Sequence, residues 1–423
     1  MLMFHNLRSI DLPTAVQKYT YTAWVVILIA LSVAWRFVLP PPPPPPPPRH
    51  SGKSSPRLPP PRSSFPASPF RLLILLLVTV LLDNLCVHMY HVVSSGNVII
   101  TGCSSGIGRA AAISLAKEFD AFTIYAGVRK QRDVASLSDE GLANLIPIIL
   151  DVTNDQHIQS AVQLLLATKR PLVALVNNAG IAVSDGPIEI VDLRRWRILF
   201  DVNIFGLLSV TQNFLPMLRS SRGRVVNVGS IAGDISQPMW GPYSSSKHAL
   251  EAITDSLRVE MRTSGVSVSL IKPGEIKTNI YAKAMLQDPE GKLNKEASKW
   301  NVNESLKKVL AQSRGTKEQH RLYEPGLKES LKFVHHVATQ ASDLECPTVI
   351  MTNNAITHAI TSSSPRTRYT FGGGAAMWMA NLLLPDKVTD VLHHWLFNLD
   401  GWQFFHGGPG TVVLNCLNVF FYW

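Results

Sequence analysis

The sequence predicts an α/β fold: a single Rossmann-type, doubly wound parallel sheet with helices on both faces, preceded by N-terminal membrane or targeting segments. After Gly96, short apolar runs alternate with helical patterns, as in a doubly wound fold. Each run is apolar throughout, which is typical of strands buried on both faces of a parallel sheet. The length of 423 residues suits one such domain with appendages. The expected strands lie within 97–101, 122–128, 145–150, 172–178, 224–230 and 266–273.

Composition narrows the class of protein. Hydrophobic residues make up 46% and charged residues 17%, a composition that is typical of a globular protein and favours membrane association. The net charge is +10, of which +6 falls within residues 1–96. No later stripe of basic residues is interleaved with aromatics, so we do not expect nucleic-acid binding. The four cysteines show no C-x-x-C spacing, so neither a zinc site nor a disulfide framework is indicated.

The first 93 residues read as three segments. Residues 1–39 contain an apolar run from Thr20 that can extend past Arg36, and they predict either a signal anchor or a cleaved signal peptide. Residues 40–71 form a linker rich in proline, serine and arginine, opened by nine consecutive prolines in polyproline II conformation. Residues 72–93 are a second hydrophobic segment, short for a clean membrane span.

These segments predict a membrane-associated protein. If both apolar segments span, the basic linker faces the cytosol and the following domain faces the lumen, which favours the endoplasmic reticulum. A linker rich in serine and arginine without acidic residues also fits a plastid targeting sequence, which is the alternative. At the other end, residues 399–423 form an aromatic-rich tail that could rest on a membrane interface.

A glycine-rich loop, "TGCSSGIG" at 101–108, follows the first expected strand and opens a helix. Its first glycine permits the tight turn, the second lets the backbone approach a pyrophosphate, and the third lets helix and strand pack closely. The helix N-terminus then faces the phosphates. This context predicts a dinucleotide site. The expected contacts from the loop are Gly102, Ser104, Ser105, Gly106, Ile107 and Gly108.

The ends of the next strands indicate which dinucleotide binds. The second strand ends without an acidic residue for a ribose hydroxyl, and Arg129 stands there instead. A guanidinium can fork onto a 2′-phosphate, which favours NADP(H) and leaves NAD(H) possible. Asp151 and Val152 follow the third strand, where the carboxylate suits the adenine amino group. "NNAG" ends the fourth strand, and its Asn178, Ala179 and Gly180 allow close approach to a ribose.

The stretch "YSSSK" places Tyr243 four residues before Lys247, so on a helix the two share one face. A phenol titrates near pH ~10 in water, and a neighbouring ammonium lowers that pKa. Tyr243 is therefore expected to be the general acid or base for a carbonyl or alcohol. Ser230 ends the preceding strand and can donate to the substrate oxygen, and Asn203 can support a water that links Lys247 to solvent.

These motifs together resemble the short-chain dehydrogenase/reductase superfamily, whose pattern reads TGxxxGxG, NNAG, N, S, YxxxK and PGxxxT. "ALEAITDSLRVEM" and the stretch from "AITHAITSSSPRTRYTF" resemble its 17β-hydroxysteroid and retinol dehydrogenase group. The resemblance covers about 97–398, expected to be the catalytic domain. It implies a homodimer, a substrate lid within 279–340, and contacts of Tyr243 and Lys247 with the nicotinamide ribose. It also implies cofactor contacts from Pro273, Gly274 and Thr278, the last holding the carboxamide.

We therefore expect an NADP(H)-dependent oxidoreductase acting on a lipophilic secondary alcohol or ketone, such as a steroid, retinoid or lipid carbonyl. One alternative is a non-catalytic NADP-binding regulator or scaffold that docks through its proline run. A nucleotide-sugar epimerase-like enzyme is a further alternative, but such enzymes carry TGxxGxxG spacing. No metal site is expected, because His335-His336 and His393-His394 are adjacent pairs without ligands at chelating spacing.

Overall fold

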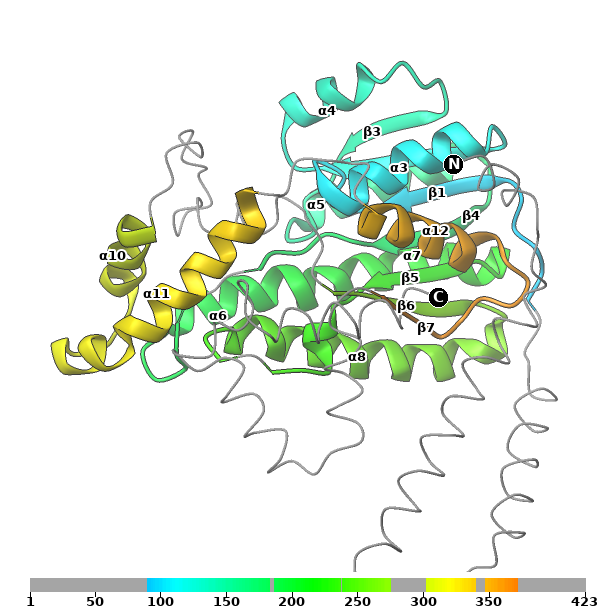
Figure 1. Cartoon of the computed structure of the whole chain (residues 1–423). Helices are drawn as coiled ribbons and strands as arrows, with labels where there is room; N and C mark the ends of the chain where they lie inside the picture. Colours follow the sequence, from blue (N-terminus) through cyan, green and yellow to red (C-terminus); the bar gives the residue numbers. More distant parts are fainter. Residues whose placement is uncertain (1–89, 183–185, 237, 275–301, 340–346, 372–423) are drawn as a thin grey trace, which may run out of the picture. The chain divides into compact units, whose positions relative to one another are not determined.

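The computed structural model describes residues 90–182, 186–236, 238–274, 302–339 and 347–371. They belong to one compact unit that begins at Met89. Its centre is a parallel sheet with the strand order β3-β2-β1-β4-β5-β6-β7 (Figure 1). The strands are β1 (Gly96–Ile100), β2 (Phe122–Val128), β3 (Leu145–Ile149), β4 (Leu172–Asn177), β5 (Arg224–Val228), β6 (Ser267–Pro273) and β7 (Arg368–Phe371).

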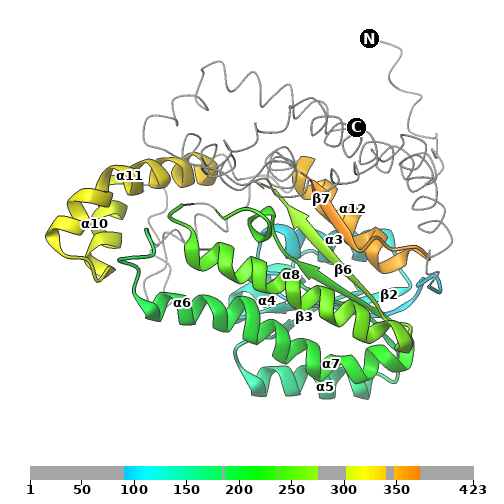
Figure 2. The same cartoon turned by 90° about the horizontal axis from the view of Figure 1, so that it is seen from below.

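Helices cover both faces of the sheet (Figure 2). Each face has its own apolar core. One core packs the strands against α3 (Gly106–Glu118), α4 (Gln131–Ser138) and α12 (Pro347–Thr361). The other packs them against α5 (Asp155–Ala167), α7 (Leu207–Ser221) and α8 (Gly241–Met261). Each fully buried aliphatic or aromatic side chain contributes roughly 1.5–3 kcal/mol, so these two cores provide most of the stability.

The remaining helices lie near the carboxyl ends of the strands or connect the larger elements. They are α6 (Leu193–Phe200), the π-helix η1 (Asp201–Gly206), the 3₁₀ turns η2 (Ile231–Gly233) and η3 (Arg262–Ser264), α10 (Val302–Gln312) and α11 (Lys317–Thr339). α10 and α11 form a helical hairpin that stands beside the sheet in Figure 1.

The chain reverses its direction of strand addition between β1 and β4. The first three strands extend the sheet one way, and β4 then pairs with the other edge of β1. In open α/β sheets, ligands bind at such a switch point, outside the carboxyl ends of the strands. The loops after β1, β4 and β5 meet there, so this edge of the sheet positions the site.

The six strands expected from the sequence are confirmed. β7 was missed, because a four-residue strand at the sheet edge with partly exposed side chains lacks a buried apolar run. The apolar segment 1–39, the linker 40–71, the tail 399–423 and most of 72–93 lie outside the described residues. Val93, from the end of that second segment, is buried in the core beside α3 and α12.

Within the described residues, the stretch Leu193–Ser221 is long and apolar enough to cross a membrane. It comprises α6, η1 and α7; Leu193, Ile198 and Phe205 are exposed, and the apolar face of α7 is buried. Val210, Phe214 and Leu218 are fully buried against the sheet. This stretch is therefore a core helix of the fold.

Candidate active site

The loop after β1 is built on glycines that no other residue could replace. Gly102 has φ 75° and Gly106 has φ 63°, a region that favours glycine. A Cβ on Gly102 would lie 2.8 Å from the Ala179 Cα, and one on Gly108 would lie 2.3 Å from the Asn178 Nδ2. The loop therefore packs directly against the turn after β4.

Hydrogen bonds join the same two segments. The Asn178 Nδ2 donates to the carbonyls of Thr101 (2.9 Å) and Gly102 (3.2 Å). The Thr101 hydroxyl accepts from the backbone N–H groups of Asn178 and Ala179, both at 3.0 Å. α3 begins at Gly106 within this frame. A helix N-terminus behind a glycine loop offers backbone N–H groups to an anion, so the arrangement fits a diphosphate.

The adenosine side of the site lies beyond β2 and β3. Arg129 directly follows β2 and is exposed, with no acidic residue at the strand end. Asp151 follows β3, and its Oδ1 accepts from the Thr153 backbone N–H (3.0 Å) and hydroxyl (2.8 Å). Val152 is buried against Gly206, where an added Cβ would lie 2.7 Å from the Val152 Cγ2. These residues border the region expected for the adenosine.

Asn203 is held by the main chain of the strand-β4 loop. It lies in the π-helix η1 and is buried. Its Oδ1 accepts from the Ile181 N–H and its Nδ2 donates to the Ile181 carbonyl, both at 2.9 Å. The Nδ2 also donates to the Ser246 hydroxyl on α8 at 3.1 Å. Asn203 therefore ties three segments together at the site, and π-helical turns are frequent at functional sites.

Tyr243, Lys247 and Ser230 come together at the start of α8. All three are buried. The Ser230 hydroxyl makes a side-chain hydrogen bond with Tyr243, and the Lys247 Nζ lies 5.7 Å from the centre of the Tyr243 ring. The Lys247 Nζ donates to the Val228 carbonyl at 3.1 Å. A Cβ on Gly180 would lie 3.9 Å from this Nζ, so the NNAG turn reaches the same spot.

Burial decides the charge of both titratable residues. It raises the pKa of Tyr243, and the hydrogen bond from Ser230 offsets only part of that rise. Burial also lowers the pKa of Lys247 to about 8. We expected a lowered pKa for Tyr243; in this structure the pKa is raised, because burial disfavours the charged phenolate. At neutral pH Tyr243 holds its proton.

An apolar cluster adjoins Tyr243, and the sequence analysis did not identify its members. The Trp240 ring meets the Tyr243 ring edge-on, with centroids 6.0 Å apart. The cluster also includes Ala182, Leu199, Ala232, Leu306, Leu327 and Leu331. The i, i+4 spacing of Leu327 and Leu331 on α11 was an available signal, but it could not show which surface they cover.

Polar contacts fix the hairpin of α10 and α11 beside this cluster. The Arg314 Nε contacts the Asp192 Oδ2 at 3.0 Å, and the Arg314 N–H donates to the Ile190 carbonyl at 2.9 Å. Hydrogen bonds from Arg194 hold the pKa of Asp192 well below its ordinary value. Glu189 accepts hydrogen bonds from Tyr323 and Gln319, both at 2.5 Å. The hairpin is thereby anchored to the segment that leads into α6.

The turn after β6 completes the described part of the site. Pro273 ends β6, and the Gly274 N–H donates to the Phe371 carbonyl at 2.8 Å. Thr278 lies outside the described residues. His335-His336 and His393-His394 have no described side chains. Where side chains are described, no cluster of three or more His, Cys, Asp or Glu could hold a metal ion.

Comparisons with known proteins agree with this geometry. The sequence profile of the family described as short chain dehydrogenase matches residues 96–288. Retinol dehydrogenase 7 of Rattus norvegicus is 34% identical over 305 residues, covering 70% of this chain and 87% of that protein. Retinol dehydrogenase 16 of Homo sapiens is 32% identical over 309 residues, covering 71% and 88%.

Two further proteins are similar over different extents. The NADPH-dependent 3-dehydrocapnine reductase of Ornithobacterium rhinotracheale is 40% identical over 195 residues, covering 44% of this chain and 67% of that protein. The crystal structure of a short-chain dehydrogenase from Streptomyces avermitilis has the same fold, with a TM-score of 0.52 and 24% identity, covering 71% of this chain and 97% of that one. This chain belongs to the short-chain dehydrogenase/reductase family and is an oxidoreductase of the retinol dehydrogenase-like group.

Proposed function

We propose that the protein transfers a hydride between NADP(H) and a lipophilic alcohol or carbonyl compound of steroid, retinoid or lipid type, foremost a secondary alcohol or ketone. One observation carries this proposal: Tyr243, Lys247 and Ser230 are buried together beside an apolar cluster, at the sheet edge where the phosphate-binding loop lies. A proton donor, a hydrogen-bond donor to the substrate oxygen and a dinucleotide cradle are what carbonyl reduction requires.

The backbone of the glycine loop supports the binding of a dinucleotide. The cramped glycines at 102 and 108 and the start of α3 suit a diphosphate. The exposed Arg129 after β2 supports NADP(H), because its planar fork can bind a 2′-phosphate. A relative named as NADPH-dependent points the same way. When bound, the nicotinamide supplies or accepts the hydride.

The proton steps belong to the residues at the start of α8. Tyr243 is protonated at neutral pH, so it can donate its phenolic proton to the carbonyl oxygen as the hydride arrives. The Ser230 hydroxyl can donate a hydrogen bond to the same oxygen and orient the substrate. Lys247 stabilises the phenolate that remains. Asn203, held by two hydrogen bonds to the main chain of Ile181, would support the water that links Lys247 to solvent.

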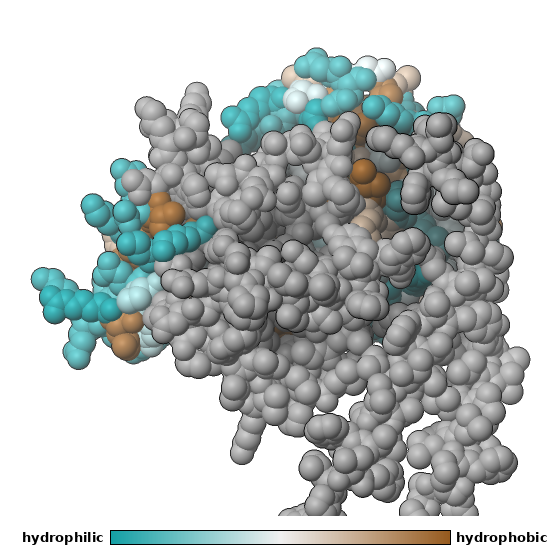
Figure 3. Space-filling view, viewed as in Figure 1, coloured by the Kyte–Doolittle hydropathy of each residue, from teal (hydrophilic) through white to brown (hydrophobic). Residues whose placement is uncertain are grey.

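The lipophilic character of the substrate is inferred from what surrounds Tyr243. Trp240, Leu306 and Leu327 pack in the same apolar cluster as Tyr243, so a substrate that reaches the phenol would meet apolar side chains, which favours an apolar substrate. The outer surface of the α10–α11 hairpin is mostly hydrophilic with hydrophobic spots (Figure 3). Two relatives are named retinol dehydrogenases, which supports a substrate of this class.

The setting of the enzyme is also part of the proposal. We place it at a membrane through the apolar segments 1–39 and 72–93, in the endoplasmic reticulum by their predicted orientation. A lipophilic substrate partitions into that membrane, so the location and the apolar site agree. The resemblance to the family supports a homodimer. The scaffold alternative is less well supported, because a binding module has no use for a buried tyrosine, lysine and serine in this order.

Tyr243→Phe tests the proposed function. The full chain in detergent is assayed with NADPH and two carbonyl probes, estrone and retinaldehyde, and NADPH binding is measured by fluorescence. We expect the variant still to bind NADPH and to lose about 10²–10⁴-fold in turnover, because it lacks the phenolic hydroxyl that donates the proton. Ser245→Ala, an exposed residue of the same helix, is the control and should keep full turnover. Equal turnover of Tyr243→Phe and the wild type would refute the assignment.

A further inference from the structure

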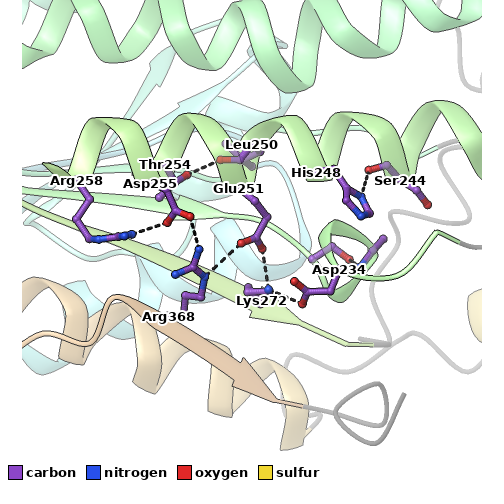
Figure 4. Close-up of polar contacts among 12 residues, drawn as sticks. Asp234, Ser244, His248, Leu250, Glu251, Thr254, Asp255, Arg258, Lys272 and Arg368 are labelled. Carbon is purple, nitrogen blue, oxygen red and sulfur yellow. Dashed lines mark hydrogen bonds and ion pairs between the residues drawn. The ribbon is translucent and has the colours of Figure 1, made fainter. Parts of the chain in front are cut away.

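A buried lysine lies where three segments of the site meet (Figure 4). Lys272 is in β6, directly before the Pro273-Gly274 turn, and its side chain is only 2% exposed. Its Nζ pairs with the Asp234 carboxylate and, at 2.8 Å, with the Glu251 Oε1. The proton transfer proposed above makes no use of this group.

Each of the two carboxylates belongs to a segment that carries a proposed catalytic residue. Asp234 directly follows η2, four residues after Ser230. Glu251 lies on α8, one helical turn beyond Lys247. A Cβ on Gly233 would lie 3.0 Å from the Lys247 carbonyl oxygen and 3.0 Å from the Glu251 Cγ. η2 therefore rests directly on the turn of α8 between Lys247 and Glu251, and Lys272 joins both segments to β6.

The triad of Lys272, Asp234 and Glu251 continues into a balanced chain of charges. The Arg368 Nε contacts the Glu251 Oε2 at 3.3 Å, and its guanidinium contacts the Asp255 Oδ2 at 2.5 Å. Arg258 contacts the Asp255 Oδ1 at 2.5 Å at the more exposed end. Cations and carboxylates alternate throughout this series of ion pairs. Removing Lys272 would take the shared ammonium away from Asp234 and leave Arg368 as the cation beside Glu251, so two mostly buried carboxylates would repel each other, which is unfavourable.

We propose that Lys272 is a positioning residue, which holds Ser230 in hydrogen-bonding register with Tyr243 by clamping η2 and α8 to β6. This inference rests on the proposed function, because Ser230 and Tyr243 matter only if they act on a substrate. Lys272 itself does not reach the substrate oxygen, since its ammonium is engaged by Asp234 and Glu251. The same clamp fixes the start of the Pro273-Gly274 turn.

The experiment compares Lys272→Met, which keeps length without charge, with Lys272→Arg, which keeps the charge. Both are made in the full chain. Hydrogen–deuterium exchange is followed in peptides covering 229–236, and kcat and KM are measured with NADPH and retinaldehyde. Arg258→Met, at the far end of the same series of ion pairs, is the matched control. It should behave as the wild type in both measurements, because its partner Asp255 is 41% exposed and keeps its ion pair with Arg368.

We expect Lys272→Met to exchange about tenfold faster in 229–236 than the wild type, because the freed carboxylates repel each other. The value of kcat should fall about 10–100-fold, with the KM for NADPH within about threefold, because a misplaced Ser230 affects the reacting oxygen and not the cofactor. Lys272→Arg should restore most of the wild-type protection from exchange and most of the wild-type kcat, since it keeps a cation between the carboxylates.

The proposal would be overturned if Lys272→Met exchanged in 229–236 at the same rate as the wild type. It would also be overturned if exchange rose by the same factor in β1 and β4. Loss of NADPH affinity without loss of kcat would also overturn it. If Lys272→Met does not fold, Glu251→Gln replaces it, and the same local rise in exchange is expected. A wild-type chain that binds NADPH but reduces no carbonyl probe contradicts the proposed function, while the exchange comparison still decides the role of Lys272.

Discussion

Burial, more than proximity, sets the charges on which the proposed reaction depends. Tyr243 and Lys247 share a helix face as the four-residue spacing predicted, yet the pKa of the tyrosine is raised and that of the lysine is lowered to about 8. Both directions follow from the loss of water around the charged form. Without cofactor the site therefore favours a neutral phenol, the form that carbonyl reduction consumes.

The lowered pKa of Lys247 makes stability depend on pH. The unfolded chain keeps this proton up to the ordinary value of 10.5, whereas the folded chain releases it near about 8. Between these values the unfolded state binds more protons, so the contribution of Lys247 to the free energy of unfolding rises with pH. As the pH is raised across this window, the Tm of the wild type should increase relative to the Tm of Lys247→Met. The variant Lys117→Met, at an exposed lysine of α3, should leave the pH dependence unchanged.

Thermal unfolding of the three chains in buffers across this window is the measurement. Parallel pH dependences of the wild type and Lys247→Met would show that Lys247 is solvated in the folded protein, and the buried arrangement around Tyr243 would then be wrong.

Single residues differ in how far sequence could place them. Gly102 and Gly106 were predictable, because their motif has a fixed backbone conformation. The pairing of Asn203 with the main chain of Ile181 was not, since it depends on how η1 meets the turn after β4. The contact of Arg314 with Asp192 joins residues far apart in the chain, and no local pattern indicates it.

At the scale of elements, the strands were the most predictable feature. Six apolar runs became β1 to β6 because strands covered on both faces need apolar side chains throughout. β7 was not predicted because it is short and lies at the edge of the sheet. The π-helix η1 could not be predicted either, since its sequence has the apolar pattern of an ordinary helix; Asn203 within it pairs with Ile181.

The α10–α11 hairpin provides a test at this scale. Leu327 on α11 is fully buried in the cluster beside Tyr243, whereas Leu322 on the same helix is 68% exposed. Leu327→Ala should lower the free energy of unfolding by about 2–5 kcal/mol at most, through lost burial and a cavity. It should raise the KM for retinaldehyde while the affinity for NADPH stays unchanged, because the hairpin contacts the apolar cluster and not the glycine loop.

Chemical denaturation, steady-state kinetics and NADPH fluorescence together make this measurement, with Leu322→Ala as the matched control that should change nothing. A loss of NADPH affinity in Leu327→Ala, or an equal effect of Leu322→Ala, would contradict the separation of the substrate side from the cofactor side.

For the whole molecule, the order of motifs along the chain matches their convergence in space. Loops after β1, β4 and β5 meet at one edge because all strands are parallel, so residues from 101 to 247 form one site. Sequence could predict this meeting, since parallel topology follows from strand–helix alternation. It could not predict the buried triad of Lys272, Asp234 and Glu251, because the three charges lie on separate elements that only tertiary packing brings together.

The most direct test of the proposed function follows the hydride itself. The full chain in detergent is incubated with NADPH carrying deuterium at the transferable position and with retinaldehyde or estrone, and the alcohol product is examined by mass spectrometry. Our account predicts an alcohol one mass unit heavier from the wild type, and about 10²–10⁴-fold less of it from Tyr243→Phe in the same time. NADPH bound tightly while no deuterated alcohol forms from either probe would contradict it and would favour a cofactor-binding protein without turnover.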